Sequence, residues 1–210
     1  MMLMQKNLHE GVTKPEVVHL KSRMKEENVA TIIQRIIGGE REAFALLMER
    51  YSSKVYGLAA RLVGNDLEAE ETTQETFIQA FTHLSDFRGE ADFGSWLYRI
   101  AYNTALKNLR RRKTTVLPID DRLTDSVSDE AADTALAEAT EERIAMVEAA
   151  LQRLTPEDRT LVTLFYYEER PTRDIAYVLG TTVSNVTTRL HRVRKRLYLI
   201  IKDMEYGTKH

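Results

Sequence analysis

Basic side chains gather in two stretches of the sequence that contain no acidic residue. Residues 98–113 carry six arginines and lysines, and residues 181–202 carry another six. Because the nucleic-acid backbone is negatively charged, acid-free basic stretches of this kind are typical of proteins that bind DNA or RNA. Each stretch could also be an ordinary solvated helix face, since charge alone does not separate the two interpretations.

The second basic stretch has the pattern of a DNA-recognition helix. Breaks at residues 170–172 and at Gly180 predict a short helix, a turn and a long helix, which together make a helix-turn-helix. At about 100° per residue, Val186, Leu190 and Val193 share one side of the long helix and are expected to face the core. The opposite side and its flanks carry hydrogen-bonding and cationic groups, which suit base edges and phosphates. The expected duplex contacts are Ser184, Asn185, Thr187, Thr188, Arg189, His191, Arg192 and Lys195.

Tyrosines accompany the cations of the first basic stretch. The helix predicted over residues 92–113 has two apolar stripes, one with Phe93 and Trp96, expected in the core, and one with Tyr98 and Tyr102. Such a helix is either packed between two neighbours, or its tyrosines stack on unpaired bases while its cations hold the backbone. The expected single-strand contacts are Tyr98, Arg99, Tyr102, Asn103, Arg110 and Arg111.

The preceding helix, predicted over residues 66–83, has the opposite charge. Several glutamates share one surface of this helix with a glutamine and a phenylalanine. This surface is either solvated or a docking site for a basic partner. The expected docking residues are Glu70, Glu71, Gln74, Glu75 and Phe77.

No pattern in the sequence supports catalysis. Cysteine is absent, which excludes thiol nucleophiles and thiolate metal sites. Only His19 follows a glutamate, Glu16, at the Glu-x-x-His spacing, whereas a di-metal helical bundle needs this motif on each of two helices, and HExxH, GxSxG and GxxxxGK[ST] are missing. We therefore expect no catalytic residue, no metal site and no cofactor. A helical enzyme with an accessory DNA-binding domain is the alternative that detectable turnover would favour.

The composition limits the fold that must position these residues. Of 210 residues, 43% are hydrophobic and 30% are charged, as in ordinary globular proteins. Nine glycines and four prolines are too few for the frequent turns of an all-β protein. No apolar run reaches the length of about 18 residues that a membrane helix needs, and the first residues lack a secretory signal. We expect an all-α, cytoplasmic protein with no membrane insertion.

Helical periodicity and composition divide the chain into two helical domains. We expect a loose extension over residues 1–27, a first domain over 28–113, an acidic linker over 114–135 and a second domain over 136–206. Within the first domain a helix is predicted over residues 40–63, and Asp66 is the expected N-cap of the next helix. In the second domain Thr155 and Thr172 are the expected N-caps of successive helices.

With these motifs the sequence resembles the extracytoplasmic-function (ECF, group 4) sigma factors of bacterial RNA polymerase, which belong to the sigma-70 family. The resemblance covers residues 41–113 and 154–197 and leaves out the extension and the linker. It is carried by EETTQETF at 70–77, FGSWLYRIAYN at 93–103, RRRK at 110–113, LTP at 154–156, DIA at 174–176 and VTTRLHRVR at 186–194. Thr187 and Lys107 depart from the family pattern, which usually has a basic residue at the first position and Asp or Asn at the second.

The resemblance implies a function for each surface. The first domain is similar to sigma-2, whose acidic helix docks on the β′ coiled coil of core RNA polymerase. Its next helix and the loop at residues 87–92 are implied to capture the non-template strand of the melted −10 element. The second domain is similar to sigma-4, which reads the duplex −35 element. Core RNA polymerase (β′ and β subunits), promoter DNA and an anti-sigma factor are the implied partners. A stand-alone helix-turn-helix regulator that binds operator DNA as a dimer is the alternative.

Overall fold

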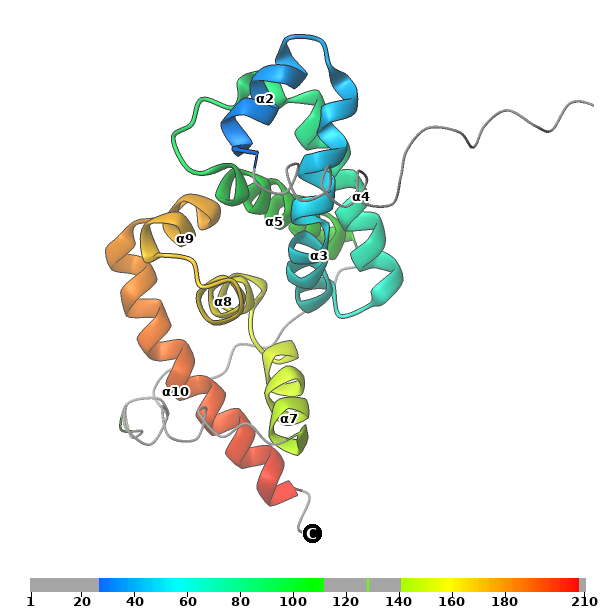
Figure 1. Cartoon of the computed structure of the whole chain (residues 1–210). Helices are drawn as coiled ribbons and strands as arrows, with labels where there is room; N and C mark the ends of the chain where they lie inside the picture. Colours follow the sequence, from blue (N-terminus) through cyan, green and yellow to red (C-terminus); the bar gives the residue numbers. More distant parts are fainter. Residues whose placement is uncertain (1–26, 112–127, 129–140, 208–210) are drawn as a thin grey trace, which may run out of the picture. The chain divides into compact units, whose positions relative to one another are not determined.

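The computed structural model describes residues 27–111, 128 and 141–207 (Figure 1). Within these residues every regular element is a helix, as the composition predicted. Most of the expected extension and nearly all of the expected acidic linker lie outside the described residues. The chain divides into two compact units, one ending at Arg50 and the other beginning at Tyr51. None of the described helices combines the length and apolarity that crossing a membrane requires.

The first unit is built around a short capped helix. It contains α2 (Val29–Ile37), the 3-10 turn η1 (Arg41–Ala43) and the first turns of α3 (Phe44–Val63). Asn28 caps α2, because its side-chain oxygen accepts the Ala30 N–H at 2.9 Å. Gly39, two residues after the end of α2, has a positive φ of 108°. Because η1 occupies the residues after this glycine, α3 begins four residues later than the helix predicted from residue 40.

The second unit begins with the rest of α3 and two further helices. These are α4 (Asp66–Thr82) and α5 (Phe93–Arg111), separated by the 3-10 turn η2 (Leu84–Asp86). Asn65, and not Asp66, caps α4: its side-chain oxygen accepts the Glu68 N–H at 3.1 Å. Asp66 instead lies in the first turn of α4, where a negative charge suits the helix dipole. Asp92 caps α5 by accepting the Ser95 N–H at 3.2 Å.

The C-terminal segment (residues 141–207) completes the second unit. It contains α7 (Glu141–Gln152), α8 (Pro156–Val162), the π-helical turn η4 (Thr163–Tyr167), α9 (Thr172–Leu179) and α10 (Val183–Gly207). Thr155 caps α8 as predicted, since its hydroxyl accepts the Asp158 N–H at 3.2 Å. Thr172, in contrast, is the first residue of α9, and Pro171 precedes it without a side-chain cap. Gly180 turns the chain between α9 and α10 with a left-handed φ of 64°, so the predicted helix-turn-helix is confirmed.

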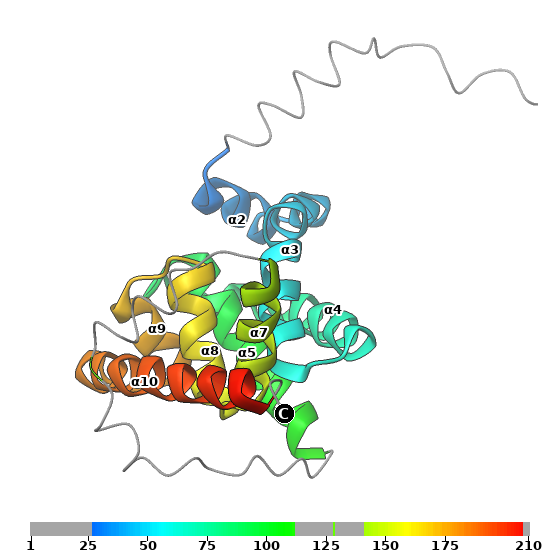
Figure 2. The same cartoon turned by 90° about the horizontal axis from the view of Figure 1, so that it is seen from below.

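The apolar stripe of α10 forms the core of the C-terminal segment. Val186, Leu190 and Val193 are buried as predicted, and the stripe continues through Leu197 to Ile200. Burying each such side chain stabilises the fold by about 1.5–3 kcal/mol. Helix α10 packs against α7, α8 and α9 (Figure 2). Helix α9 in turn packs against α5, so the C-terminal segment and the α3–α5 segment (residues 51–111) are in direct contact within the second unit.

Candidate nucleic-acid interface

The polar face of α10 lies open to solvent at its N-terminal end. The exposed members of the predicted duplex-binding set are Ser184, Asn185, Thr187, Thr188, His191 and Arg192, and Lys195 is half-buried. Thr182 caps the helix, because its hydroxyl accepts the Asn185 N–H at 3.2 Å. The helix therefore begins with its hydrogen-bonding side chains at the surface, as a helix that enters a major groove requires.

Arg189 is the member of this set that the structure places differently. Its Nε and Nη2 atoms both donate to Oδ1 of the buried Asp158, at 3.1 and 2.7 Å. Arg196, two turns further along α10, donates from Nη1 to the other oxygen of the same carboxylate at 2.7 Å. Asp158 therefore ties two turns of α10 to the start of α8, and Arg189 is held by this buried partner. The sequence analysis missed Asp158 because pairing across helices leaves no local spacing signal.

Both tyrosines of α5 are buried against the C-terminal segment. Tyr98 is 1% exposed and Tyr102 is 6% exposed. The Tyr98 hydroxyl donates to Oε2 of Glu168, and burial together with this carboxylate raises the pKa of Tyr98 far above its ordinary value. Burial and the nearby Glu157 charge raise the pKa of Tyr102 to about 12. Of the two interpretations of this stripe, the structure adopts the packed one, and in this conformation neither ring is open to a base.

The polar residues of α5 remain at the surface beside the buried tyrosines. Asn103, Arg110 and Arg111 are exposed. Arg99 is also exposed, but its Nη1 donates to the Tyr177 carbonyl at 3.2 Å and its guanidinium lies 4.9 Å from the centre of that ring. The cationic edge of α5 is thus accessible, and one of its members is engaged by α9.

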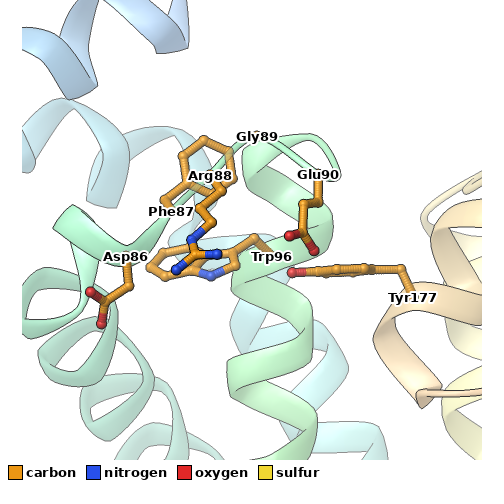
Figure 3. Close-up of a pocket in the computed structure, with 7 residues that line it drawn as sticks. All are labelled: Asp86, Phe87, Arg88, Gly89, Glu90, Trp96 and Tyr177. Carbon is orange, nitrogen blue, oxygen red and sulfur yellow. The ribbon is translucent and has the colours of Figure 1, made fainter.

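A pocket of about 290 Å³ lies between the loop before α5 and helix α9 (Figure 3). It is lined by Asp86, Phe87, Arg88, Gly89, Glu90, Trp96 and Tyr177. The Phe87 and Trp96 rings are 5.4 Å apart, and Figure 3 shows Tyr177 reaching toward them from the other side. Trp96, which its stripe placed in the core, is half-buried and forms part of the pocket wall. The resemblance pointed to this loop, whereas the contribution of Tyr177 depends on tertiary packing alone.

The predicted docking surface on α4 differs in composition from the one expected. Glu70, Glu71 and Gln74 are exposed, and Glu75 is half-buried with Lys107 Nζ 3.3 Å from its Oε1 atom. Phe77 is only 4% exposed and belongs to the core. The apolar side chains that do reach the surface of α4 are Leu67 and Ile78, each 66% exposed, and Phe81.

Comparisons with known proteins identify the family of the chain. The family model of sigma-70 region 2 matches residues 47–115, and that of sigma-70 region 4 matches residues 144–197. The chain is 33% identical over 182 residues to the RNA polymerase sigma-H factor of Pseudomonas aeruginosa, covering 83% of this chain and 94% of that one. It is 31% identical over 179 residues to the ECF RNA polymerase sigma factor SigW of Bacillus subtilis, covering 82% and 96% respectively.

A solved structure shares both the fold and part of the sequence. This is CnrH, determined in complex with the cytosolic domain of CnrY, with a TM-score of 0.60 and 25% identity over 82% of this chain and 96% of that chain. The family resemblance inferred from the motifs is therefore confirmed. The chain belongs to the ECF sigma factors of the sigma-70 family, proteins that are not enzymes but direct RNA polymerase to promoters and initiate transcription.

Proposed function

We propose that three separate surfaces of this chain carry the sigma-factor activity. The exposed face of α10 reads the duplex −35 element, the aromatic pocket and the polar edge of α5 hold the unpaired −10 strand, and the exposed face of α4 docks on core RNA polymerase. The observation that carries this proposal is the presence of a duplex-type recognition helix and a separate aromatic pocket in one chain. An operator-binding regulator needs only the helix.

The α10 assignment rests on exposure and chemistry. Arg192 is exposed on the groove-facing side and suits a bidentate contact with guanine, while the exposed Asn185 suits adenine. Thr187 and Thr188 donate their hydroxyls back to the carbonyls of Val183 and Ser184, at 3.1 and 3.0 Å. Their methyl groups are therefore the parts best suited to apolar contacts with thymine. Arg189 acts through its tie to Asp158, which holds α10 against α8.

The −10 assignment rests on the aromatic wall of the pocket. Phe87 and Trp96 offer flat rings on which an unpaired base can stack, and the adjacent Arg88 offers a cation. From there the exposed side chains of Asn103 and Arg110 follow α5 and provide a polar track for the sugar-phosphate backbone. Bases read in this way must be out of the duplex, which matches a melted promoter segment.

The α4 assignment rests on spacing. The exposed residues of its stripe are Leu67, Glu71, Gln74, Ile78 and Phe81, which are four, three, four and three residues apart. At about 100° per residue they fall within about 80° of arc, the narrow seam that a helix offers to a coiled-coil partner. Acidic side chains among apolar ones favour a partner helix that carries basic residues. This combination supports docking on the β′ coiled coil of the polymerase, with the β subunit as a further contact.

The partners of the relatives extend the proposal. CnrH was solved with the cytosolic domain of CnrY. By analogy, we assign to this chain a cytoplasmic location and an anti-sigma factor that holds it until a signal arrives. No described residue identifies the class of that partner.

Binding to purified core RNA polymerase tests the proposal. We expect a fluorescently labelled chain to bind the core enzyme one to one and to confer initiation on selected promoters in a transcription assay. Tight binding of a dimer to duplex DNA, combined with no binding to the core enzyme, would contradict it and favour a stand-alone helix-turn-helix regulator.

A further inference from the structure

A carboxylate from another helix holds two of the six cations in residues 181–202. Arg189 and Arg196 of α10 donate to opposite oxygens of Asp158, and the nearest nitrogen lies at 2.7 Å in each case. Asp158 is in the first turn of α8 and is buried. The acid-free basic stretch of α10 is therefore partly neutralised from outside, by a residue that its own pattern does not contain.

The two held arginines lie beside the residue that we assign to base reading. Arg192 comes one helical turn after Arg189 and one turn before Arg196. Residues three and four apart are neighbours on the surface of a helix, so both arginines border Arg192. The Arg189 side chain is still 32% exposed, so it lies at the edge of the recognition face. Because a guanidinium suits phosphate oxygens well, both side chains would be phosphate contacts if Asp158 did not hold them.

Burial makes Asp158 a stronger competitor for these arginines than an exposed carboxylate would be. The side chains of Asp158 and Arg196 are only 6% and 13% exposed, so salt screens their attraction little. Arg189 donates to Asp158 from two nitrogens, at 3.1 and 2.7 Å, which fixes the direction of its guanidinium. Phosphates that pass along the surface of α10 must therefore displace a buried partner before they can bind either arginine.

We propose that Asp158 is a positioning residue for promoter selection, because it keeps Arg189 and Arg196 away from the phosphates of duplex DNA. This inference rests on the function proposed above, since it concerns how α10 distinguishes the −35 element from other sequences. Phosphate contacts strengthen binding to every sequence, whereas a base contact such as that of Arg192 strengthens binding to one. Holding two arginines at the edge of the recognition face thus lowers nonspecific affinity and raises the ratio of specific to nonspecific binding.

The salt dependence of DNA binding counts phosphate contacts and therefore tests Asp158 directly. The full-length chain and its D158N variant are titrated with a mixed-sequence DNA duplex at about 50 to 200 mM salt. D203N is the matched control, because it removes the same charge and breaks the 3.0 Å ion pair of Asp203 with Arg153. Asp203 lies on α10 as well, but about 21 Å from Arg189 along the helix axis.

We expect the slope of log affinity against log salt to be steeper in D158N than in the wild type by about 0.9 to 1.8, for one or two added phosphate contacts. With two added contacts, D158N loses about twelvefold more affinity than the wild type over that salt range. D203N should keep the wild-type slope. An unchanged or shallower slope in D158N would overturn the inference, because removal of a purely structural carboxylate only weakens binding. An equal increase in D203N would also overturn it, because net charge alone would explain the effect.

Arg189→Gln tests the same point with less disturbance of the fold, because Asp158 keeps its contact with Arg196. We expect R189Q to have the wild-type slope, and D158N/R189Q to lose about 0.9 of the increase seen in D158N. A slope that is shallower by about 0.9 in R189Q alone would overturn the inference, because Arg189 would then contact a phosphate in the wild type. If circular dichroism shows that D158N does not fold, the slope of R189Q decides.

Promoter binding by the polymerase complex distinguishes a failure of this inference from a failure of the proposed function. The wild-type chain, bound to core RNA polymerase, is given a promoter duplex and the same duplex with a scrambled −35 element. We expect a preference for the intact element that is smaller in D158N. Equal binding of both duplexes by the wild-type complex would refute the assignment of α10 to the −35 element. A preference that D158N retains in full would refute only the inference about Asp158.

Discussion

Helices α5 and α10 share the same sequence pattern, but the face opposite the core stripe lies in a different environment in each helix. Both contain an acid-free basic stretch beside an apolar stripe that packs in a core. Helix α10 leaves its opposite face in water, whereas α5 buries that face and the two tyrosines on it. A helix face that reads duplex DNA is polar and can remain exposed to water when no DNA is bound. A face that stacks on bases is apolar, and covering it stabilises the free chain.

The difference between the two helices depends on the contact of the C-terminal segment with α5. The substitution expected to have the largest effect is Arg159→Ala. The substitution removes the buried guanidinium that donates to the carbonyls of Leu62 in α3, Leu151 in α7 and Leu154 after α7, at 2.8, 2.8 and 3.0 Å. We therefore expect the free energy of unfolding to fall by about 3 kcal/mol or more, measured by urea denaturation. R153A should change it by less than about 1 kcal/mol, because its ion pair is exposed. A loss in R159A no larger than that of the control would contradict the anchoring role of Arg159.

A substitution on the exposed face of α10 should reduce the specificity for −35 DNA and leave the stability of the fold unchanged. Arg192→Ala should weaken binding of the polymerase complex to −35 promoter DNA by about 1–3 kcal/mol, or roughly tenfold to a hundredfold, and relax the preference at one base pair. Binding to core polymerase should be unchanged, as competition with the labelled wild-type chain would show. If R192A instead lost affinity equally for all sequences, Arg192 would be a phosphate contact and not a base contact.

The α4 surface gives a smaller expected effect, because its contacts are spread along a helix. The double substitution Gln74→Ala and Glu75→Ala should weaken binding to core polymerase about tenfold and leave the DNA contacts of α10 intact. Lys107→Ala is the matched control, since it removes the Lys107–Glu75 ion pair and keeps both acidic-face residues. Equal losses in the control and the double variant would assign the effect to that ion pair. Circular dichroism checks that both variants remain folded.

The smallest expected effect is a dependence of the contact between α9 and α5 on pH. Asp174 of α9 is buried next to Asp92, and burial and the Asp92 charge both raise the pKa of Asp174. A carboxyl group whose pKa is higher when α9 packs on α5 than when the two helices are apart favours the packed arrangement as the pH falls toward that pKa. Asp92, whose pKa is about 2, stays ionised; Arg170 lies 2.7 Å from Asp92, and Arg173 lies 3.7 Å from Asp174.

Acrylamide quenching of Trp96 at pH 7 and pH 5 measures this dependence. We expect quenching to decrease at the lower pH in the wild type and to become independent of pH in Asp174→Asn, which cannot titrate. His83 Nδ1 lies 3.1 Å from Oδ2 of Asp86, which lines the pocket, so H83Q serves as the control for a contribution of this imidazole. Increased quenching at pH 5, or a pH response retained in D174N, would exclude Asp174 as the responsible group.

Local signals in the sequence predicted most of the fold. The helix-turn-helix followed from the break at Pro171, the glycine turn and the apolar stripe through Val186 and Leu190, and the structure has each of them. Caps were predicted less well: Thr155 was correct, whereas Asn65 took the place expected for Asp66. Adjacent polar residues can each cap a helix, and the backbone geometry that selects between them is settled by packing.

The sequence by itself determined the all-helical architecture, the order of the motifs and the polar face of α10. Periodicity and turn residues act over a few positions, so they can be read from the chain directly. Only the tertiary structure decided that Phe77 and both tyrosines of α5 are buried, that Asp158 holds Arg189, and that Tyr177 completes the pocket. These outcomes depend on which residues distant in sequence pack together. An amphipathic pattern shows that a face is apolar, but it does not show what covers that face.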